Sequence, residues 1–318
     1  MSISSGAGLP PAIFLMGPTA SGKTAATIAL AQRFPVDIIS VDSALVYRGM
    51  DIGTAKPDAD TLRQAPHHLI DLISPLEQYS AAQFAKDALA LMHTATANGR
   101  IPVLVGGTML YFNALQHGLS DLPEADTAIR AQIEAEANTF GWPAIHAQLA
   151  SIDPTVAAKI HTTDSQRIER ALEVYRISGK PMSELRAQSQ KVSLPFSILK
   201  LALMPSDRSV LHQRIAERFK LMLQHGFIDE VKRLLIEYPQ LTADSPSMRC
   251  VGYRQALQHL HGEIDLPTLG EHGVYATRQL AKRQLTWLRG MDDVHALDCL
   301  RTDWVGEAVH LIQHHAQL

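Results

Sequence analysis

Short apolar runs alternate with amphipathic segments along the first hundred residues of the chain. The apolar runs at residues 12–16, 36–41 and 101–105 predict β-strands, and apolar residues spaced by three and four predict helices at 22–33 and 80–99. The predicted strands are apolar at consecutive positions rather than at alternate ones, which is typical of strands covered on both faces. We therefore expect an α/β fold in which helices cover both sides of a parallel sheet.

The pattern changes near residue 123. From there to about residue 190 the apolar spacing is helical throughout, and a strand-like run returns only at residues 197–204. These changes predict two parts. An α/β core consists of residues 1–122 and 191–318, and a helical insertion domain consists of residues 123–190.

A further helical region follows the run at 197–204. Asp207 is a suitable N-cap, and Gly226 is a suitable end for a helix whose apolar stripe contains Leu211, Ile215 and Phe219. The core is thus expected to carry additional C-terminal helices.

Composition and charge exclude several classes of protein. The chain has 318 residues and a formal net charge of −3, so a uniformly basic nucleic-acid coat is excluded, although a local basic face is not. Two cysteines provide neither a disulfide framework nor a cysteine-rich zinc site. The start of the chain lacks a targeting pattern, and no apolar stretch is long enough to cross a bilayer. We expect a cytoplasmic protein without a membrane partner, and a monomer by default.

The most specific motif lies between the first predicted strand and the first predicted helix, where residues 17–24 fit G-x-x-x-x-G-K-[ST]. In this P-loop pattern, backbone N–H groups and the start of the helix bind phosphate, the lysine reaches the terminal phosphates, and the last hydroxyl is a ligand for Mg²⁺. The motif indicates a diphosphate or triphosphate but no particular nucleotide. The expected diphosphate-binding residues are Gly17, Pro18, Thr19, Ala20, Ser21, Gly22, Lys23 and Thr24, with Thr24 as the metal ligand.

The acidic residue that usually accompanies a P-loop is absent from the expected place. In a P-loop kinase or NTPase a later strand ends in an aspartate that helps to hold Mg²⁺. Here the run at 101–105 is followed by Gly106, Gly107 and Thr108. Asp42, after the run at 36–41, is therefore the candidate general base or metal-shell ligand, because ligands collect at the carboxyl ends of parallel strands. A turn cap made with Ser43 is the structural alternative for Asp42.

Several ordered motifs together resemble the bacterial tRNA dimethylallyltransferases, also called tRNA isopentenyltransferases. The resemblance extends from Pro11 to Arg289 and is much more specific than the P-loop alone. The matching motifs occupy residues 17–24, 39–47, 50–57, 105–111, 164–174, 249–255 and 277–289.

The resemblance implies transfer of a dimethylallyl group from dimethylallyl diphosphate to N6 of adenosine 37 of tRNA. The P-loop would then bind the diphosphate leaving group with Mg²⁺, and the helical insertion would close on the anticodon arm. Asp42 would accept the proton from the amine, Thr19 would contact the bridging oxygen, and Lys23 would stabilise the leaving group. The target base would have to leave its stack to reach this pocket. A P-loop metabolite or nucleotide kinase and a nucleotide-gated RNA-binding module are the alternatives.

The same resemblance also implies a set of tRNA contacts. These are Asp42, Ser43, Ala44, Leu45, Thr108, Arg130, Gln166, Arg167, Ile168, Glu169, Arg170, Arg249, Cys250, Val251, Gly252, Tyr253, Arg254, Lys282, Arg283, Gln284, Leu285, Thr286, Trp287, Leu288 and Arg289. Among them, Arg249, Tyr253 and Arg254 have side chains suited to stacking on splayed bases.

Residues 275–290 contain four basic residues and no acidic one. At ~100° per residue along a helix, Arg278, Lys282 and Arg289 share one side, whereas Trp287 and Leu288 lie opposite. This arrangement predicts a basic face that contacts RNA phosphates, and it places Trp287 in the core.

Overall fold

The computed structural model describes residues 8–118, 122–188 and 193–317. The chain divides into two compact units. Unit 1 combines Met1–Gln116 with Leu194–Leu318, and unit 2 covers His117–Ser193. The predicted insertion at 123–190 falls within unit 2, but its predicted end at residue 190 lies outside the described residues.

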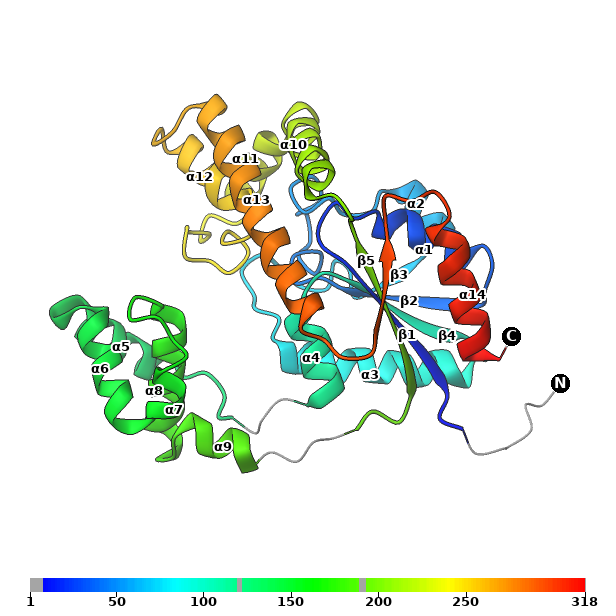
Figure 1. Cartoon of the computed structure of the whole chain (residues 1–318). Helices are drawn as coiled ribbons and strands as arrows, with labels where there is room; N and C mark the ends of the chain where they lie inside the picture. The colour runs from blue at the N-terminus through cyan, green and yellow to red at the C-terminus, as the bar shows by residue number, and fades with distance from the viewer. Residues whose placement is uncertain (1–7, 119–121, 189–192, 318) are drawn as a thin grey trace. The chain divides into compact units, whose positions relative to one another are not determined.

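The centre of unit 1 is a parallel six-stranded sheet with the order β3-β2-β4-β1-β5-β6 (Figure 1). The α/β fold is confirmed, and so are the four strands predicted at 12–16, 36–41, 101–105 and 197–204. The two edge strands, β3 and β6, are not predicted from the sequence, because one has only two residues and the other has a single buried residue. The strands are β1 Pro11–Met16, β2 Val36–Val41, β3 His67–His68, β4 Ile101–Gly106, β5 Ser197–Met204 and β6 Val294–Asp298.

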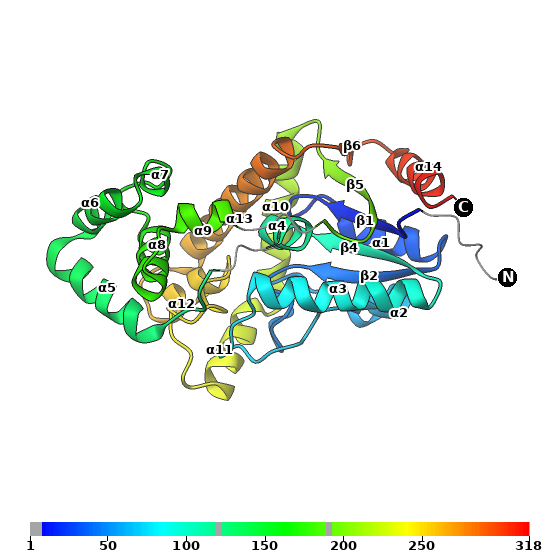
Figure 2. The ribbon, with the colours of Figure 1, turned by 90° about the horizontal axis from the view of Figure 1, so that it is seen from below.

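Helices cover both faces of this sheet, as the consecutive apolar residues of its strands require. On β1, Phe14 packs with the core that includes α3 and α4, whereas Ile13 and Leu15 pack with the core that includes α1 and α14. Seen from below, α3 and α4 lie in front of the sheet (Figure 2). The helices associated with the sheet are α1 Lys23–Ala31, α2 Ala59–Gln64, α3 Ala81–Ala97, α4 Met109–His117 and α14 Trp304–Ala316.

Four helices between β5 and β6 form the rest of unit 1: α10 Arg208–Gln224, α11 Phe227–Glu237, α12 Tyr253–Leu260 and α13 Leu266–Arg289. The Asp207 side chain accepts the N–H of Ser209 at 2.7 Å and caps α10, as predicted. Gly273 of α13 touches the ring of Phe219 of α10, and a Cβ there would lie 2.0 Å from a ring carbon. The two helices therefore pack closely. Although α13 has 24 residues, no described helix is long and apolar enough to span a membrane.

In its described residues unit 2 contains helices and no strand, and its helices are α5 Thr127–Phe140, α6 Trp142–Ile152, α7 Pro154–Ala157, α8 Ser165–Ser178 and α9 Met182–Gln188. Ile133, Leu149 and Leu172 belong to its apolar core. The buried Glu173 carboxylate accepts hydrogen bonds from the guanidinium groups of Arg130 and Arg170. Burial alone would raise the pKa of Glu173, but these two arginines hold it below its usual range.

Candidate functional site

Residues 17–24 form a loop between β1 and α1, as the P-loop pattern predicts. Ala20 and Gly22 adopt φ angles of 63° and 91°, which turn the chain back toward the start of α1. The Ser21 hydroxyl is buried and has no hydrogen-bond partner within the part of the chain that the structure describes. A buried polar atom without a partner is costly, so this hydroxyl is suited to a polar ligand in the loop.

Lys23 lies inside the curve of the loop. Its ammonium group donates to the carbonyl oxygens of Gly17 at 3.0 Å and Pro18 at 2.7 Å. Burial lowers the pKa of Lys23 to about 8, although the nearby Asp42 carboxylate acts in the opposite direction. The loop thus places a cation beside backbone donors, the combination that binds phosphate.

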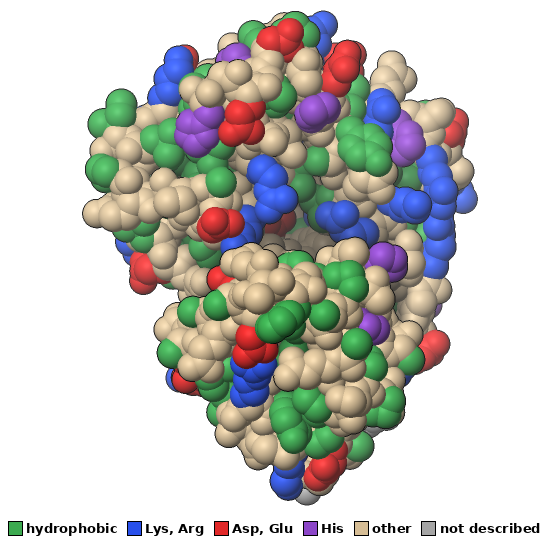
Figure 3. All heavy atoms as spheres, turned by 90° about the vertical axis from the view of Figure 1, so that its left-hand side faces the viewer, with side chains coloured by type: hydrophobic (Ala, Val, Ile, Leu, Met, Phe, Trp, Pro, Cys, Tyr) green, Lys and Arg blue, Asp and Glu red, His purple; other side chains and the backbone are tan. Residues whose placement is uncertain are grey.

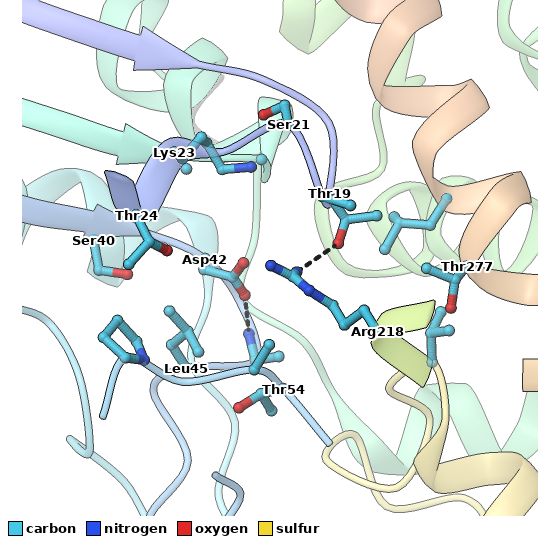
Figure 4. Close-up of a pocket in the computed structure, with 18 of the residues that line it drawn as sticks. Thr19, Ser21, Lys23, Thr24, Ser40, Asp42, Leu45, Thr54, Arg218 and Thr277 are labelled. Carbon is cyan, nitrogen blue, oxygen red and sulfur yellow. Dashed lines mark hydrogen bonds between the residues drawn. The ribbon is translucent and has the colours of Figure 1, made fainter. Parts of the chain in front are cut away.

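Asp42 directly follows β2, at the same edge of the sheet as the P-loop (Figure 4). Its Oδ1 accepts the N–H of Ala44 at 2.9 Å, so the predicted turn cap is present, although its donor is Ala44 rather than Ser43. Burial raises the pKa of Asp42, an effect opposed by this hydrogen bond and by Lys23. A carboxylate with a raised pKa, in a pocket that also contains a cation, is suited to accept a proton.

Arg218 of α10 reaches the same pocket and was not among the predicted site residues. Its guanidinium group donates to the Thr19 hydroxyl at 3.5 Å and lies between Thr19 and Asp42 in the close-up (Figure 4). Burial lowers the pKa of Arg218. The available signal was its position three residues after Ile215 on the apolar stripe of α10, because an arginine on a buried helix face usually has an anionic partner.

A segment that follows β2 forms the wall opposite the P-loop. Gly53, Thr54 and Ala55 line the pocket there. The buried Glu230 carboxylate of α11 accepts the backbone N–H groups of residues 51–53 at 2.7 to 3.1 Å. It also accepts the hydroxyl of Tyr253 at 2.6 Å. The C-terminal helices therefore fix the position of this wall.

Gln284 of α13 contacts the P-loop directly. Its Oε1 accepts the N–H of Thr19 at 2.9 Å, and its Nε2 donates to the carbonyl oxygen of Gly107 at 2.9 Å. The side chain is 8% exposed. Both ends of the Gln284 amide are thus bound within the protein, although the residue lines the pocket. Its predicted contact with tRNA stays a prediction.

The structure brings most of the predicted phosphate-site residues together in one pocket, here called the P-loop pocket. Predicted residues that line it are Thr19, Ala20, Ser21, Gly22, Lys23, Thr24, Asp42, Ala44, Leu45, Cys250, Val251 and Gln284. Gly17, Pro18, Ser43 and Thr108 do not line it, and the Thr108 hydroxyl accepts the N–H of Ser43 at 3.0 Å.

Several predicted tRNA contacts have side chains that the protein interior encloses. The Tyr253 ring is fully buried among the C-terminal helices, so the prediction that it stacks on a base is wrong. Leu285, Leu288 and, in unit 2, Ile168 are also buried apolar residues that pack into hydrophobic cores. The prediction named runs of consecutive residues as tRNA contacts. On a helix, consecutive residues point in different directions, so some members of each run face the protein core.

For Trp287 the error is the reverse: the residue is predicted to be buried but is exposed. Its side chain is 45% exposed, whereas the helical-wheel argument places it in the core. Near the end of α13 the buried residues are Ala281, Gln284, Leu285 and Leu288, which form a narrow stripe. Trp287 lies ~100° from Leu288 around the helix and therefore falls outside that stripe.

The sequence matches the IPP transferase family over residues 45–291, which is most of the chain. The chain belongs to this family. It is therefore an enzyme of the transferase class. A tRNA dimethylallyltransferase from Methylobacillus flagellatus is 60% identical over 303 residues, which cover 95% of this chain and 96% of the relative. A tRNA dimethylallyltransferase from Ralstonia pickettii is 58% identical and covers 98% of this chain and 97% of its own.

Solved structures of transferases share the fold of this IPP transferase family member. A tRNA isopentenylpyrophosphate transferase from Bacillus halodurans has a TM-score of 0.71 and 36% identity, with 96% of this chain and 97% of the other covered. A eukaryotic dimethylallyltransferase acting on tRNA has a TM-score of 0.80 and 28% identity, with 95% of this chain and 78% of the other covered.

The predicted tRNA contacts of unit 2 lie on α5 and α8. Arg130 and Arg170 bind the buried Glu173, so part of their charge is used within the unit. Arg167 is exposed and pairs with Asp164 at 3.5 Å. Their contacts with RNA, and those of Gln166 and Glu169, stay predictions.

Proposed function

We propose that this chain is a tRNA dimethylallyltransferase that transfers the dimethylallyl group of dimethylallyl diphosphate to N6 of adenosine 37 and releases diphosphate. One observation carries the chemistry. The P-loop pocket has cations, Lys23 and Arg218, near the loop, and a half-buried carboxylate, Asp42, facing the same cavity. An anionic leaving group and a proton acceptor are what this reaction requires, and the names of the relatives agree with it.

In this reaction the amine nitrogen forms a bond to the allylic carbon as the bond from that carbon to the diphosphate oxygen breaks. The amine becomes acidic as it bonds carbon, and the Asp42 carboxylate accepts its proton. The Thr19 hydroxyl, held by Arg218, donates toward the oxygen on which negative charge develops. Lys23 and Arg218 stabilise the departing diphosphate electrostatically.

Mg²⁺ is the proposed metal. The Thr24 hydroxyl lines the pocket, is exposed, and is a hard oxygen ligand of the kind that Mg²⁺ prefers. Oxygens of the diphosphate would complete the site together with water, and the ion would neutralise charge on the leaving group. Asp42 lines the same pocket and is the acidic candidate for its outer shell.

The proposed docking surface for tRNA lies on α12, the residues just before it, and α13. A hollow that shares Cys250 and Val251 with the P-loop pocket is lined by Arg249, Arg254 and Arg283. Lys and Arg side chains gather on the face of unit 1 drawn in Figure 3. A base extruded from the anticodon loop would enter the adjoining pocket while neighbouring phosphates contact these cations.

Exchanging Lys282 and Arg283 for alanine is expected to weaken tRNA binding without slowing the chemical step. Both side chains are exposed on α13, and each lost phosphate contact should lower the salt slope of binding by ~0.7–1. Titrations of tRNA at several salt concentrations measure this slope. The matched control is the Lys232→Ala/Arg233→Ala variant of α11, another exposed lysine–arginine pair. Equal slopes for the two variants and the unchanged protein would refute the docking surface.

Incubation with tRNA and labelled dimethylallyl diphosphate, beside labelled ATP, tests the function itself. We expect label from the prenyl donor in tRNA, release of diphosphate, and no phosphoryl transfer from ATP. The kinase alternative predicts the reverse, and a binding module predicts neither product. β4 ends in Gly106 without an acidic residue, and a Cβ at Gly106 would lie 2.0 Å from the carbonyl oxygen of Val41, so the structure leaves no room for an aspartate there.

A further inference from the structure

The Gln284 amide of α13 accepts a hydrogen bond directly from the backbone of the P-loop. Its two ends join elements that are remote in sequence, because Thr19 is 265 residues away and Gly107 is 177 residues away. The amide therefore connects the loop after β1 to the end of β4. Gly107 makes room for it, since a Cβ at this position would lie 2.3 Å from Nε2.

Thr19 is consequently held from two helices. Gln284 of α13 accepts from its backbone N–H, and Arg218 of α10 donates to its hydroxyl. Within the loop, the backbone hydrogen bond from Ser21 to Pro18 does not fix the Thr19 N–H. The orientation of the Thr19 side chain toward the pocket thus depends on these two contacts.

We propose that Gln284 is a positioning residue that holds the P-loop, through Thr19, in the conformation that receives the diphosphate. This inference rests on the proposed function, because it assigns a diphosphate to the loop. Gln284 acts through the backbone of Thr19 and does not touch the reacting atoms. Its neighbours Lys282 and Arg283 are exposed on the same helix, so α13 carries both the docking surface and the support of the loop.

The test uses two substitutions of different chemistry. Gln284→Met keeps the length and volume of the side chain but removes both hydrogen bonds. Gln284→Glu has the same shape, and when its carboxyl group is protonated it can again accept from Thr19 and donate to Gly107. When ionised, it faces the Gly107 carbonyl oxygen with a second acceptor and repels diphosphate. The matched control is Gln258→Met, the same exchange at a half-buried position of α12 that lines neither the P-loop pocket nor the adjoining hollow.

The readouts are the dissociation constant for inorganic pyrophosphate, the kinetic constants for both substrates, and the midpoint of unfolding. A lost hydrogen bond is worth about 1 kcal/mol, so we expect Gln284→Met to weaken pyrophosphate binding about five- to tenfold. kcat/KM for dimethylallyl diphosphate should fall by a similar factor, while KM for tRNA stays within about twofold. Gln258→Met should change none of these constants.

The pH dependence of Gln284→Glu separates positioning from a general loss of stability. Relative to the unchanged protein, its affinity for pyrophosphate should rise as the pH falls and the introduced carboxyl group becomes protonated. A ratio that does not change with pH, or wild-type pyrophosphate affinity for Gln284→Met, would overturn the inference. If the unchanged protein neither binds pyrophosphate nor transfers the prenyl group, the proposed function fails instead.

Discussion

Replacing Asp42 by asparagine is expected to lower the single-turnover rate of prenyl transfer by ~10²-fold or more. Asparagine keeps the shape of the side chain and can still accept the Ala44 N–H, but it cannot take a proton from the amine. The dissociation constant for tRNA should change little, because the exposed cations of α12 and α13 contribute most of the proposed docking. Rapid mixing of preformed enzyme–tRNA complex with labelled dimethylallyl diphosphate measures the rate.

The pH profile provides the control for this substitution. Burial raises the pKa of Asp42, and a base is active only when deprotonated, so the rate should fall as the pH decreases through this raised value. The Asp42→Asn variant should lack this acid limb. A variant with nearly full rate, or with an unchanged acid limb, would exclude Asp42 as the base.

The centre of the fold could be predicted because its signals are local. β1, β2 and β4 consist of consecutive apolar residues, and the P-loop is encoded in eight adjacent positions. The carboxyl ends of parallel strands meet at one edge, so Asp42 could be placed beside Lys23 from the order of elements alone. The pocket contains both residues.

The other half of the site depends on packing between distant segments. Arg218 and Thr19 are 199 residues apart, and Gln284 and Thr19 are 265 residues apart. Glu230 supports the opposite wall from α11, 177 to 179 residues beyond the N–H groups that it binds. No periodicity specifies which loop a helix will touch, so these polar contacts become apparent only once α10, α11 and α13 are docked.

Which side chains of α13 are exposed could not be predicted fully from the sequence. A helical wheel gives the relative directions of side chains, but it does not give the width of the face that other elements cover. Leu285 and Leu288 are buried, whereas Trp287 between them in sequence is 45% exposed. An exposed tryptophan four residues after the exposed Arg283, and so next to it on the helix surface, agrees better with a surface that contacts RNA than with a purely structural helix end.

Replacing Lys23 by alanine is expected to weaken binding of dimethylallyl diphosphate by about 10- to 100-fold, since a hydrogen bond to a charged group is worth about 1.5–3 kcal/mol. Lys23 is one of the two cations that line the P-loop pocket, with Arg218 on the other side. Inorganic pyrophosphate should compete with the donor and lose affinity to the same extent. Competition titrations without tRNA measure both constants.

Because Lys23 can lose its proton, binding of pyrophosphate is expected to depend on pH. Because burial lowers the pKa of Lys23 to about 8, the free enzyme should lose pyrophosphate affinity as the pH rises through this value and the ammonium group loses its proton. The Lys23→Ala variant should not show this loss, and Lys23→Arg should bind with a constant affinity across the same range, because guanidinium stays charged. Tight Mg²⁺-dependent binding of ATP that neither pyrophosphate nor dimethylallyl diphosphate displaces would contradict the prediction and support a kinase. Displacement by both would instead place the prenyl donor in the P-loop, where the Asp42 carboxylate faces it.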